Sequence, residues 1–258
     1  MAVRIQCPTL KDMSDPGNFY CRKGFYALNL QAICDKNKRF LWASIMNKGS
    51  SHDSAAFAGS KLLDLLKEKA HHLKREGLFL NGDSAYPLYS FLQVPYDQVE
   101  AQDDPVGAKD AFNYYHSANR IWIECAFGEF IMRWGMFWRT LRFDSVFKSG
   151  QVIHAAMLLH NFIIEARMAE DQEADTTHFR SFSTNTDSRV QANMTELTNE
   201  TPRAVVTDTN EPQPPGRRTI SENKLMEEGA LLCNSIMLSV ARGNLKRPTK
   251  SGMRYNDE

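Results

Sequence analysis

The chain has 258 residues, 42% of them hydrophobic, which suits one large domain or one domain with appendages; its 31 basic and 31 acidic residues leave no net charge. This balance excludes a strongly basic protein that coats DNA, although local patches can still bind phosphate. The five scattered cysteines include no C-x-x-C pair, and no apolar run reaches the roughly 18 residues of a membrane helix. We therefore expect a soluble intracellular protein without a disulfide framework or a zinc module.

Residues 1–168 have the composition of a globular domain, and the first part of this segment shows strand patterns. The apolar segments 26–34 and 39–46 predict two neighbouring strands, because the polar turn residues DKNK separate them. From Asp53 the leucines recur at helical spacing, which predicts a helix capped by Asp53 or by the serine after it. The sequence GLFLNGD at 77–83 predicts a short buried strand.

The second half of the chain is helical and then changes in composition. Helices are predicted at 108–133 and 150–170 from their apolar spacing. Residues 171–221 are rich in Thr, Asn, Ser, Pro and acidic residues, so we expect a disordered linker. A last helix at 222–242 precedes a basic tail, 243–258. The order of strands and helices indicates an α/β or α+β class with a small mixed sheet.

Two carboxylates are the candidate functional residues. Asp83 lies where the predicted short strand ends; taken alone, such an aspartate is more often a turn residue than a metal ligand. Glu124 lies in the helical segment SANRIWIECAFGEF, where residues 121–127 are otherwise apolar. An ionised carboxylate in such a run is costly unless a partner compensates it. For Glu124 that partner is either Arg120 or Arg133 in an ion pair, or a divalent metal.

Together, a strand-end aspartate and a helix-borne glutamate are what a divalent-metal nuclease needs. Oxygen ligands suit Mg²⁺, and two such ions can activate the attacking water and stabilise the leaving oxygen. A hydrolase that uses paired carboxylates on sugars is a weaker alternative, because the sequence has no signature of a sugar platform.

Five motifs follow one another along the first two thirds of the chain: FYCRKGFYALNLQAICD, KGSSHDS, NGDSAYPL, RIWIECAFGEFIMRWGMF and LLHNF. In this order they resemble the DDE endonuclease domain of Harbinger-type transposases and their domesticated descendants, over about residues 1–168. The resemblance implies an RNase H-like fold, in which helices flank a mixed sheet, and metal-dependent hydrolysis of DNA with two Mg²⁺ or Mn²⁺ ions. It gives Asp83 and Glu124 the roles of catalytic residues and metal ligands.

The sequence departs from the family pattern at its start. The first catalytic aspartate of the family normally lies directly before the stretch that AVRIQCPT resembles, and this position falls before Met1. We therefore expect a truncated gene model, a fragment, or a protein that has lost catalysis. In an RNase H-like arrangement Asp53 would lie at the same end of the sheet as Asp83. Asp53 and His52 are thus candidates for an accessory metal role, and a helix cap is the alternative for Asp53.

Basic and aromatic residues alternate in the segment 133–148. We expect Arg120, Arg133, Arg139 and Lys148 to contact DNA phosphates. For the aromatic residues of this segment, packing in the core is the favoured role, and stacking on exposed bases is the alternative. The resemblance further implies a separate DNA-binding partner protein. We also expect a nuclear location, for which the basic tail can serve in import, while the question of a homo-oligomer stays open. The alternative function is a catalytically inactive descendant that binds DNA or protein.

Overall fold

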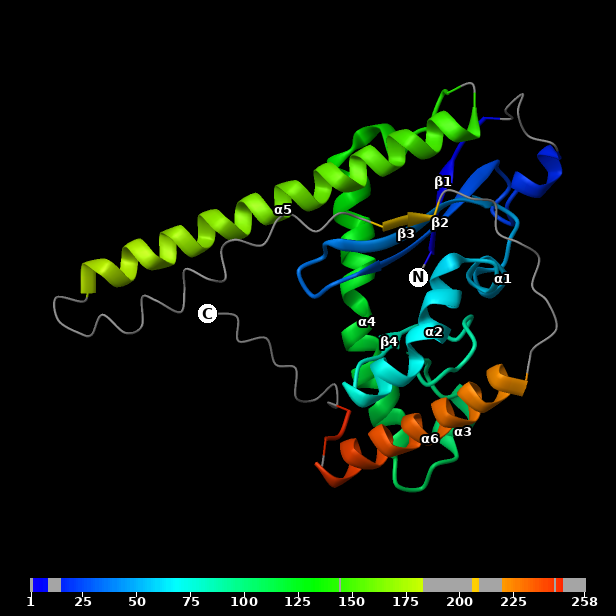
Figure 1. Ribbon diagram of the computed structural model, residues 1–258, viewed down its shortest axis with the longest axis vertical. Helices are drawn as coiled ribbons and strands as arrows, with labels where there is room; N and C mark the ends of the chain where they lie inside the picture. The colour runs from blue at the N-terminus through cyan, green and yellow to red at the C-terminus, as the bar shows by residue number, and fades with distance from the viewer. Residues whose placement is uncertain are drawn as a thin grey trace. The chain divides into compact units, whose positions relative to one another are not determined.

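The computed structural model describes residues 2–8, 15–143, 145–182, 206–208, 220–243 and 245–247 (Figure 1). The chain divides into two compact units, which split the predicted domain 1–168. The sheet unit comprises residues 2–50 and 125–210, and the helical unit comprises residues 51–124 and 211–258. Helix α4 (Ala108–Arg133) contributes its residues up to Glu124 to the helical unit and the others to the sheet unit.

The sheet unit contains a four-stranded mixed sheet in the order β1-β2-β3-β6 (Figure 1). Its strands are Ala2–Gln6 (β1), Ala27–Cys34 (β2), Phe40–Lys48 (β3) and Val206–Asp208 (β6). The first three are antiparallel, and β6 runs parallel to β3. The predicted pair of neighbouring strands and its DKNK turn are therefore confirmed, and so is the mixed sheet.

Aromatic and aliphatic side chains from helices fill the core of the sheet unit. Phe40 of β3 is fully buried, with its ring 5.6 Å from that of Phe130 on α4, and Phe130 in turn stacks on Phe137 at 4.8 Å. Phe137 belongs to a 3-10 turn, Gly135–Trp138. Asn161 of helix α5 (Val146–Phe182) accepts a hydrogen bond from the Phe40 N–H and donates one to the Phe40 C=O, both at 2.8 Å. These two bonds fasten α5 to the start of β3.

Helix α5 runs from Val146 to Phe182, longer than the predicted helix 150–170. Its last turns fall in the range predicted to be a linker, where Gln, Glu and Ala are good helix formers. Strand β6 also lies in the predicted linker range. Residues 183–205 and 209–219 of that range lie outside the described part of the chain. Disorder in those two segments stays a prediction.

The helical unit begins with two helices where the sequence predicted one. Helix α1 is Asp53–Ala58 and helix α2 is Lys61–Arg75. The break follows from Gly59 at the end of α1 and from Ser60, whose side chain caps α2 by accepting a hydrogen bond from the Leu63 N–H at 3.3 Å. The predicted cap of the first helix was wrong by one residue: the N-cap position is His52, and Asp53 is the first helical residue.

The predicted buried strand at 77–83 is much shorter in the structure. Only Leu80–Asn81 (β4) is a strand, and it pairs in parallel with Leu92–Gln93 (β5) in a separate two-stranded sheet. Leu78, within the predicted strand, is 56% exposed, so the prediction that this strand is buried was wrong. Strand β4 is not part of the four-stranded sheet, which would have covered it on both sides.

Two further helices complete the helical unit: Gln98–Gln102 (α3) and Ile220–Arg242 (α6). Helix α6 agrees with the predicted last helix, 222–242, apart from its first two residues. It packs against the loop between β4 and β5, where the Ser90 N–H donates to the Leu225 carbonyl at 3.0 Å. In the tail, Arg247 pairs with Asp110 at 3.1 Å, and residues 248–258 lie outside the described residues. No described helix is both long enough and apolar enough to cross a membrane.

Candidate acidic site

Asp83 lies two residues after the end of β4, behind Gly82, and opens a turn. One of its carboxylate oxygens accepts a hydrogen bond from the Ala85 N–H at 2.9 Å, and its backbone carbonyl accepts one from Tyr86 N–H at 3.1 Å. The side chain is half-buried. Gly82 just before it lies so close to Leu92 that an added Cβ would be 3.1 Å from the Leu92 Cδ1 atom. The turn role expected for an isolated aspartate is thus present, and it uses one oxygen of the carboxylate.

Glu124 forms an ion pair with Arg120, one turn earlier on α4. The Arg120 Nη1 atom lies 2.7 Å from the Glu124 Oε1 atom, so the ion-pair alternative is confirmed. The expectation that an apolar run encloses Glu124 was wrong, because Glu124 is 41% exposed and Ile121 and Trp122 are 49% and 42% exposed. Near Glu124 the helix buries one face, which carries Ile123, Ala126 and Phe127. A helical pair of residues four positions apart stabilises a helix by about 0.3–0.5 kcal/mol.

His116 is a residue of this site that the sequence analysis missed. It lies two turns before Glu124, on the face that also carries Arg120, and it is only 4% exposed. Its Nε2 atom is 3.1 Å from the Gln93 carbonyl oxygen; because a carbonyl only accepts, the ring proton is on Nε2. Its Nδ1 atom is buried and has no hydrogen-bond partner among the described residues.

The Gln93 carbonyl connects the aspartate loop to α4. It accepts a hydrogen bond from the Gly82 N–H at 2.8 Å as well as the one from His116. The pKa of His116 is lowered, chiefly by burial; the Gln93 hydrogen bond and Asp83 oppose the shift, and Arg120 adds to it. The charges of Asp83 and Arg120 both affect the pKa of the same imidazole. The loop of Asp83 and this face of α4 are therefore close enough to interact electrostatically. The only sequence signal for His116 was its spacing from Glu124.

The carboxylates of Asp83 and Glu124 are suitable ligands for a hard divalent cation, but two of them are too few for a complete site. Their oxygens are the ligand type that Mg²⁺ and Mn²⁺ prefer. However, within the described part of the chain no three His, Cys, Asp or Glu side chains form a group that could hold a metal ion. Asp53, the third predicted ligand, is half-buried at the start of α1 and belongs to no such group. A complete site therefore needs a further ligand beyond Asp83 and Glu124.

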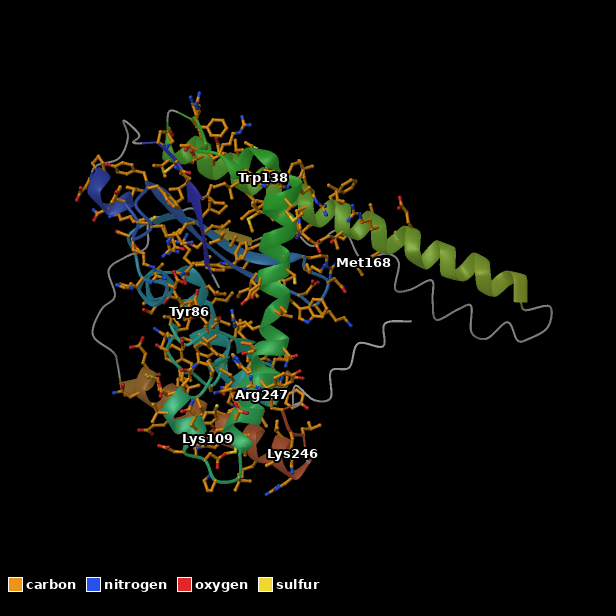
Figure 2. All side chains as sticks on the ribbon, turned by 180° about the vertical axis from the view of Figure 1, so that it is seen from behind. Tyr86, Lys109, Trp138, Met168, Lys246 and Arg247 are labelled. Carbon is orange, nitrogen blue, oxygen red and sulfur yellow. The ribbon has the colours of Figure 1, made fainter. Side chains whose placement is uncertain are left out.

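The other predicted DNA contacts lie in the sheet unit and differ in exposure. Arg139 and Lys148 are exposed, whereas Arg133 is half-buried. The aromatic residues of the same segment divide in two: Phe137 is in the core, as expected, but Trp138 is 66% exposed and donates its indole N–H to the Ile131 carbonyl at 2.8 Å (Figure 2). Arg139 and Lys148 are thus accessible to a phosphate.

Comparison with known proteins identifies the class. The sequence model of the DDE superfamily endonuclease family matches residues 1–161, well over half of the chain, and the chain belongs to this family. This finding confirms the resemblance at the level of the family. No curated protein and no solved structure matches the chain. Helix α6 lies outside the matched residues.

Proposed function

We propose that this chain derives from a Harbinger-type transposase and that its domain hydrolyses DNA phosphodiester bonds in the nucleus, on an RNase H-like fold. The family match supports a nuclease. The single observation that carries the site is the Gln93 carbonyl, which holds the Gly82 N–H beside Asp83 and the His116 ring on α4. This shared acceptor ties the strand-end carboxylate to the helix that bears Glu124.

Asp83 and Glu124 would hold the divalent metal, Mg²⁺ or Mn²⁺, with two ions implied by the family resemblance. When bound, such ions supply an activated water and charge stabilisation for the leaving oxygen. Arg120 balances the charge of Glu124 in the metal-free protein, at 2.7 Å. His116, kept neutral by burial, holds the Gln93 carbonyl and with it the loop of Asp83. The family resemblance implies a third carboxylate, the family's first aspartate.

Several finer roles belong to the same proposal. Asp53 takes an accessory role near the metal, and the exposed Arg139 and Lys148 contact DNA phosphates together with Arg120 and Arg133. A separate DNA-binding partner protein supplies sequence recognition, and a homo-oligomer is compatible with this arrangement.

The test uses the chain extended before Met1 by the family's Asp-Gly. Asp83→Asn and Glu124→Gln should each abolish nicking of supercoiled DNA in Mg²⁺ or Mn²⁺ and leave the metal-free melting temperature unchanged. They should also remove the stabilisation by metal, which for a bound ligand at a hundred times its Kd is about 2.7 kcal/mol.

A matched control variant is Asp97→Asn. Asp97 accepts a hydrogen bond from the Val99 N–H at 2.9 Å, the same kind of turn bond that Asp83 makes with Ala85. This control should retain both nicking and metal stabilisation. Full nicking activity in either the Asp83 or the Glu124 variant would refute the assignment of the site.

The second candidate function is an inactive descendant that binds DNA or protein. The Arg120–Glu124 ion pair favours it, because this pair compensates the glutamate without any metal. A melting temperature that does not respond to Mg²⁺ or Mn²⁺ in the extended chain, with DNA binding retained, would support this function over hydrolysis.

A further inference from the structure

A pocket of about 330 Å³ opens in the sheet unit, and neither Asp83 nor Glu124 lines it. The turn between β2 and β3, the end of α4 and the middle of α5 form its walls. The residues that matter for its chemistry are Lys38, Glu129, Met132, Arg133, Arg167 and Met168. Figure 2 shows Met168 on α5. The pocket therefore combines cationic groups with apolar thioether side chains.

The charges that line this pocket are not balanced. Three cationic side chains line it against one carboxylate, and Glu129 is already bonded to the Lys38 ammonium. Arg133 and Arg167 form no ion pair with another described residue. The Arg133 Nη1 atom is buried and lacks a hydrogen-bond acceptor among the residues that the structure describes. Burial, and secondly the neighbouring Arg167, lower the pKa of Arg133, as expected in a region of positive potential.

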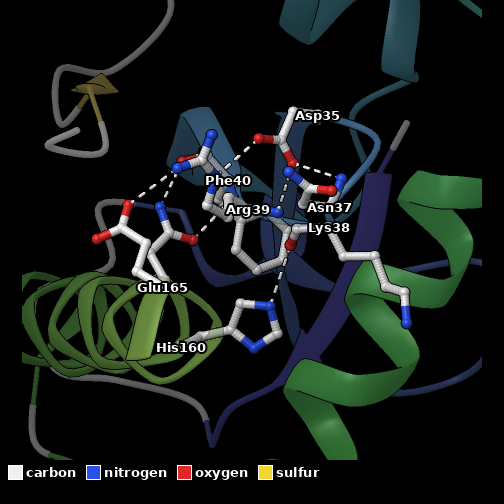
Figure 3. Close-up of polar contacts among 8 residues, drawn as sticks. Asp35, Asn37, Lys38, Arg39, Phe40, His160 and Glu165 are labelled. Atoms are coloured by element: carbon white, nitrogen blue, oxygen red, sulfur yellow. Dashed lines mark hydrogen bonds and ion pairs between the residues drawn. The ribbon is translucent and has the colours of Figure 1, made fainter. Parts of the chain in front are cut away.

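Lys38 holds an unfavourable backbone conformation at the rim of the pocket. Its φ is +67°, a left-handed value that glycine or asparagine usually takes. The turn is held in place on both sides, because the Lys38 N–H donates to the Asp35 carbonyl at 3.0 Å and the His160 Nε2 atom donates to the Lys38 carbonyl at 3.1 Å (Figure 3). Backbone strain of this kind clusters at functional sites.

A double ion pair fixes the same turn. The Asp35 carboxylate accepts hydrogen bonds from the backbone N–H groups of Asn37 and Arg39 at 2.8 and 3.0 Å. The Arg39 side chain bridges Asp35, at 2.7 Å, and Glu165 of α5, at 3.2 Å (Figure 3). The rim of the pocket is thus preorganised, which lowers the cost of binding a ligand there.

We propose that this pocket binds one nucleotide unit of a DNA strand, with its phosphate on Arg133 and Arg167 and its sugar or base against Met132, Ile164 and Met168. Guanidinium groups match the planar fork of phosphate oxygens, and both arginines line the pocket. The apolar wall distinguishes a nucleotide from free phosphate. The inference rests on the proposed function in taking DNA as the ligand, but it uses no residue of the acidic pair.

The experiment measures the anisotropy of a short labelled single-stranded oligodeoxynucleotide, with inorganic phosphate and a deoxynucleoside monophosphate as competitors. Arg133→Gln and Arg167→Gln should each weaken binding about tenfold, as loss of a charge-assisted hydrogen bond does. The slope of log K against log salt should fall by about 0.7 for the lost phosphate contact. Lys36→Gln is the matched control, because Lys36 is exposed in the same turn and does not line the pocket.

Arg133→Met separates lost binding from lost folding. Because an apolar side chain removes an unpaired buried donor, its melting temperature should equal or exceed that of the parent while oligonucleotide binding falls. Binding within about twofold of the parent in both arginine variants would overturn the proposal, and so would an equal loss in Lys36→Gln. Inorganic phosphate competing as well as the mononucleotide would overturn the nucleotide assignment. The binding is measured without Mg²⁺ or Mn²⁺, so a failed nuclease assay leaves this result intact.

Discussion

Gly229 of α6 should be intolerant of any side chain. An added Cβ would lie 2.5 Å from the Tyr89 carbonyl carbon, 2.8 Å from its oxygen and 2.9 Å from the Ser90 nitrogen. These atoms are backbone and are held in place, since the Tyr89 N–H donates to the Leu92 carbonyl at 2.9 Å and the Ser90 N–H donates to the Leu225 carbonyl at 3.0 Å. Gly229→Ala must therefore move α6 away from the loop.

The size of the effect follows from two opposing contributions. In a helix interior, replacing glycine by alanine stabilises by about 1 kcal/mol. Forcing an extra carbon into a packed contact costs about 1–3 kcal/mol. Because the clash is with backbone rather than with a flexible side chain, we expect the upper end of that range, and hence a net loss of about 2 kcal/mol.

Urea unfolding with a thiol probe measures this prediction. Cys233 of α6 is 3% exposed, and burial is the main cause that raises its pKa, so the parent thiol should react slowly. In a Cys125→Ser background, which removes the exposed cysteine, Gly229→Ala should speed the reaction of Cys233 and lower the unfolding midpoint. Gly128→Ala in α4 is the control: an added Cβ there meets nothing within 4 Å, so it should stabilise by about 1 kcal/mol. Equal stabilisation by both substitutions would refute the packing of α6 on the loop.

Two further predictions concern the sheet unit. Asn161→Ala leaves the buried N–H and C=O of Phe40 unpaired and should cost about 2–4 kcal/mol in urea unfolding. Asn113→Ala breaks the same pair of bonds to the half-buried Tyr96 and should cost less because water can replace them; equal costs would contradict this reasoning. Burial lowers the pKa of His160 below 6.5, so the unfolded chain binds its proton at higher pH than the folded one. Stability should therefore fall as the pH drops below 6.5, and His160→Gln should flatten that dependence in unfolding midpoints measured across the pH range.

Local patterns in the sequence were enough to place β2, β3 and the turn between them. The DKNK turn between two apolar segments has its counterpart in the turn from Asp35 to Arg39, because polar turn formers and strand residues act over a few positions only. Helix α4 begins and ends as the sequence predicted, since its apolar spacing persists over its whole length. Such features depend on neighbours in the chain, which the sequence displays directly.

Burial and partnership depend on distant segments, and there the sequence analysis failed. The run around Glu124 looks uniformly apolar in one dimension, yet the helix has an exposed side that carries Trp122 and the glutamate itself. His116 gains its significance from the Gln93 carbonyl, a backbone atom 23 residues away that no composition or motif marks. Whether a strand such as β4 finds a partner is likewise decided by tertiary structure.

The two candidate sites share one device, a buried neutral histidine that holds a backbone carbonyl. His116 of α4 binds the Gln93 carbonyl beside the Asp83 loop, and His160 of α5 binds the Lys38 carbonyl at the pocket rim, each at 3.1 Å. Burial lowers the pKa of both rings and so keeps them neutral, and the carbonyl acceptor places the single proton of each ring on Nε2. A neutral ring also adds no charge beside the neighbouring arginines. The segments that present the functional side chains are thus positioned by hydrogen bonds that do not compete with those side chains for an anion or a metal.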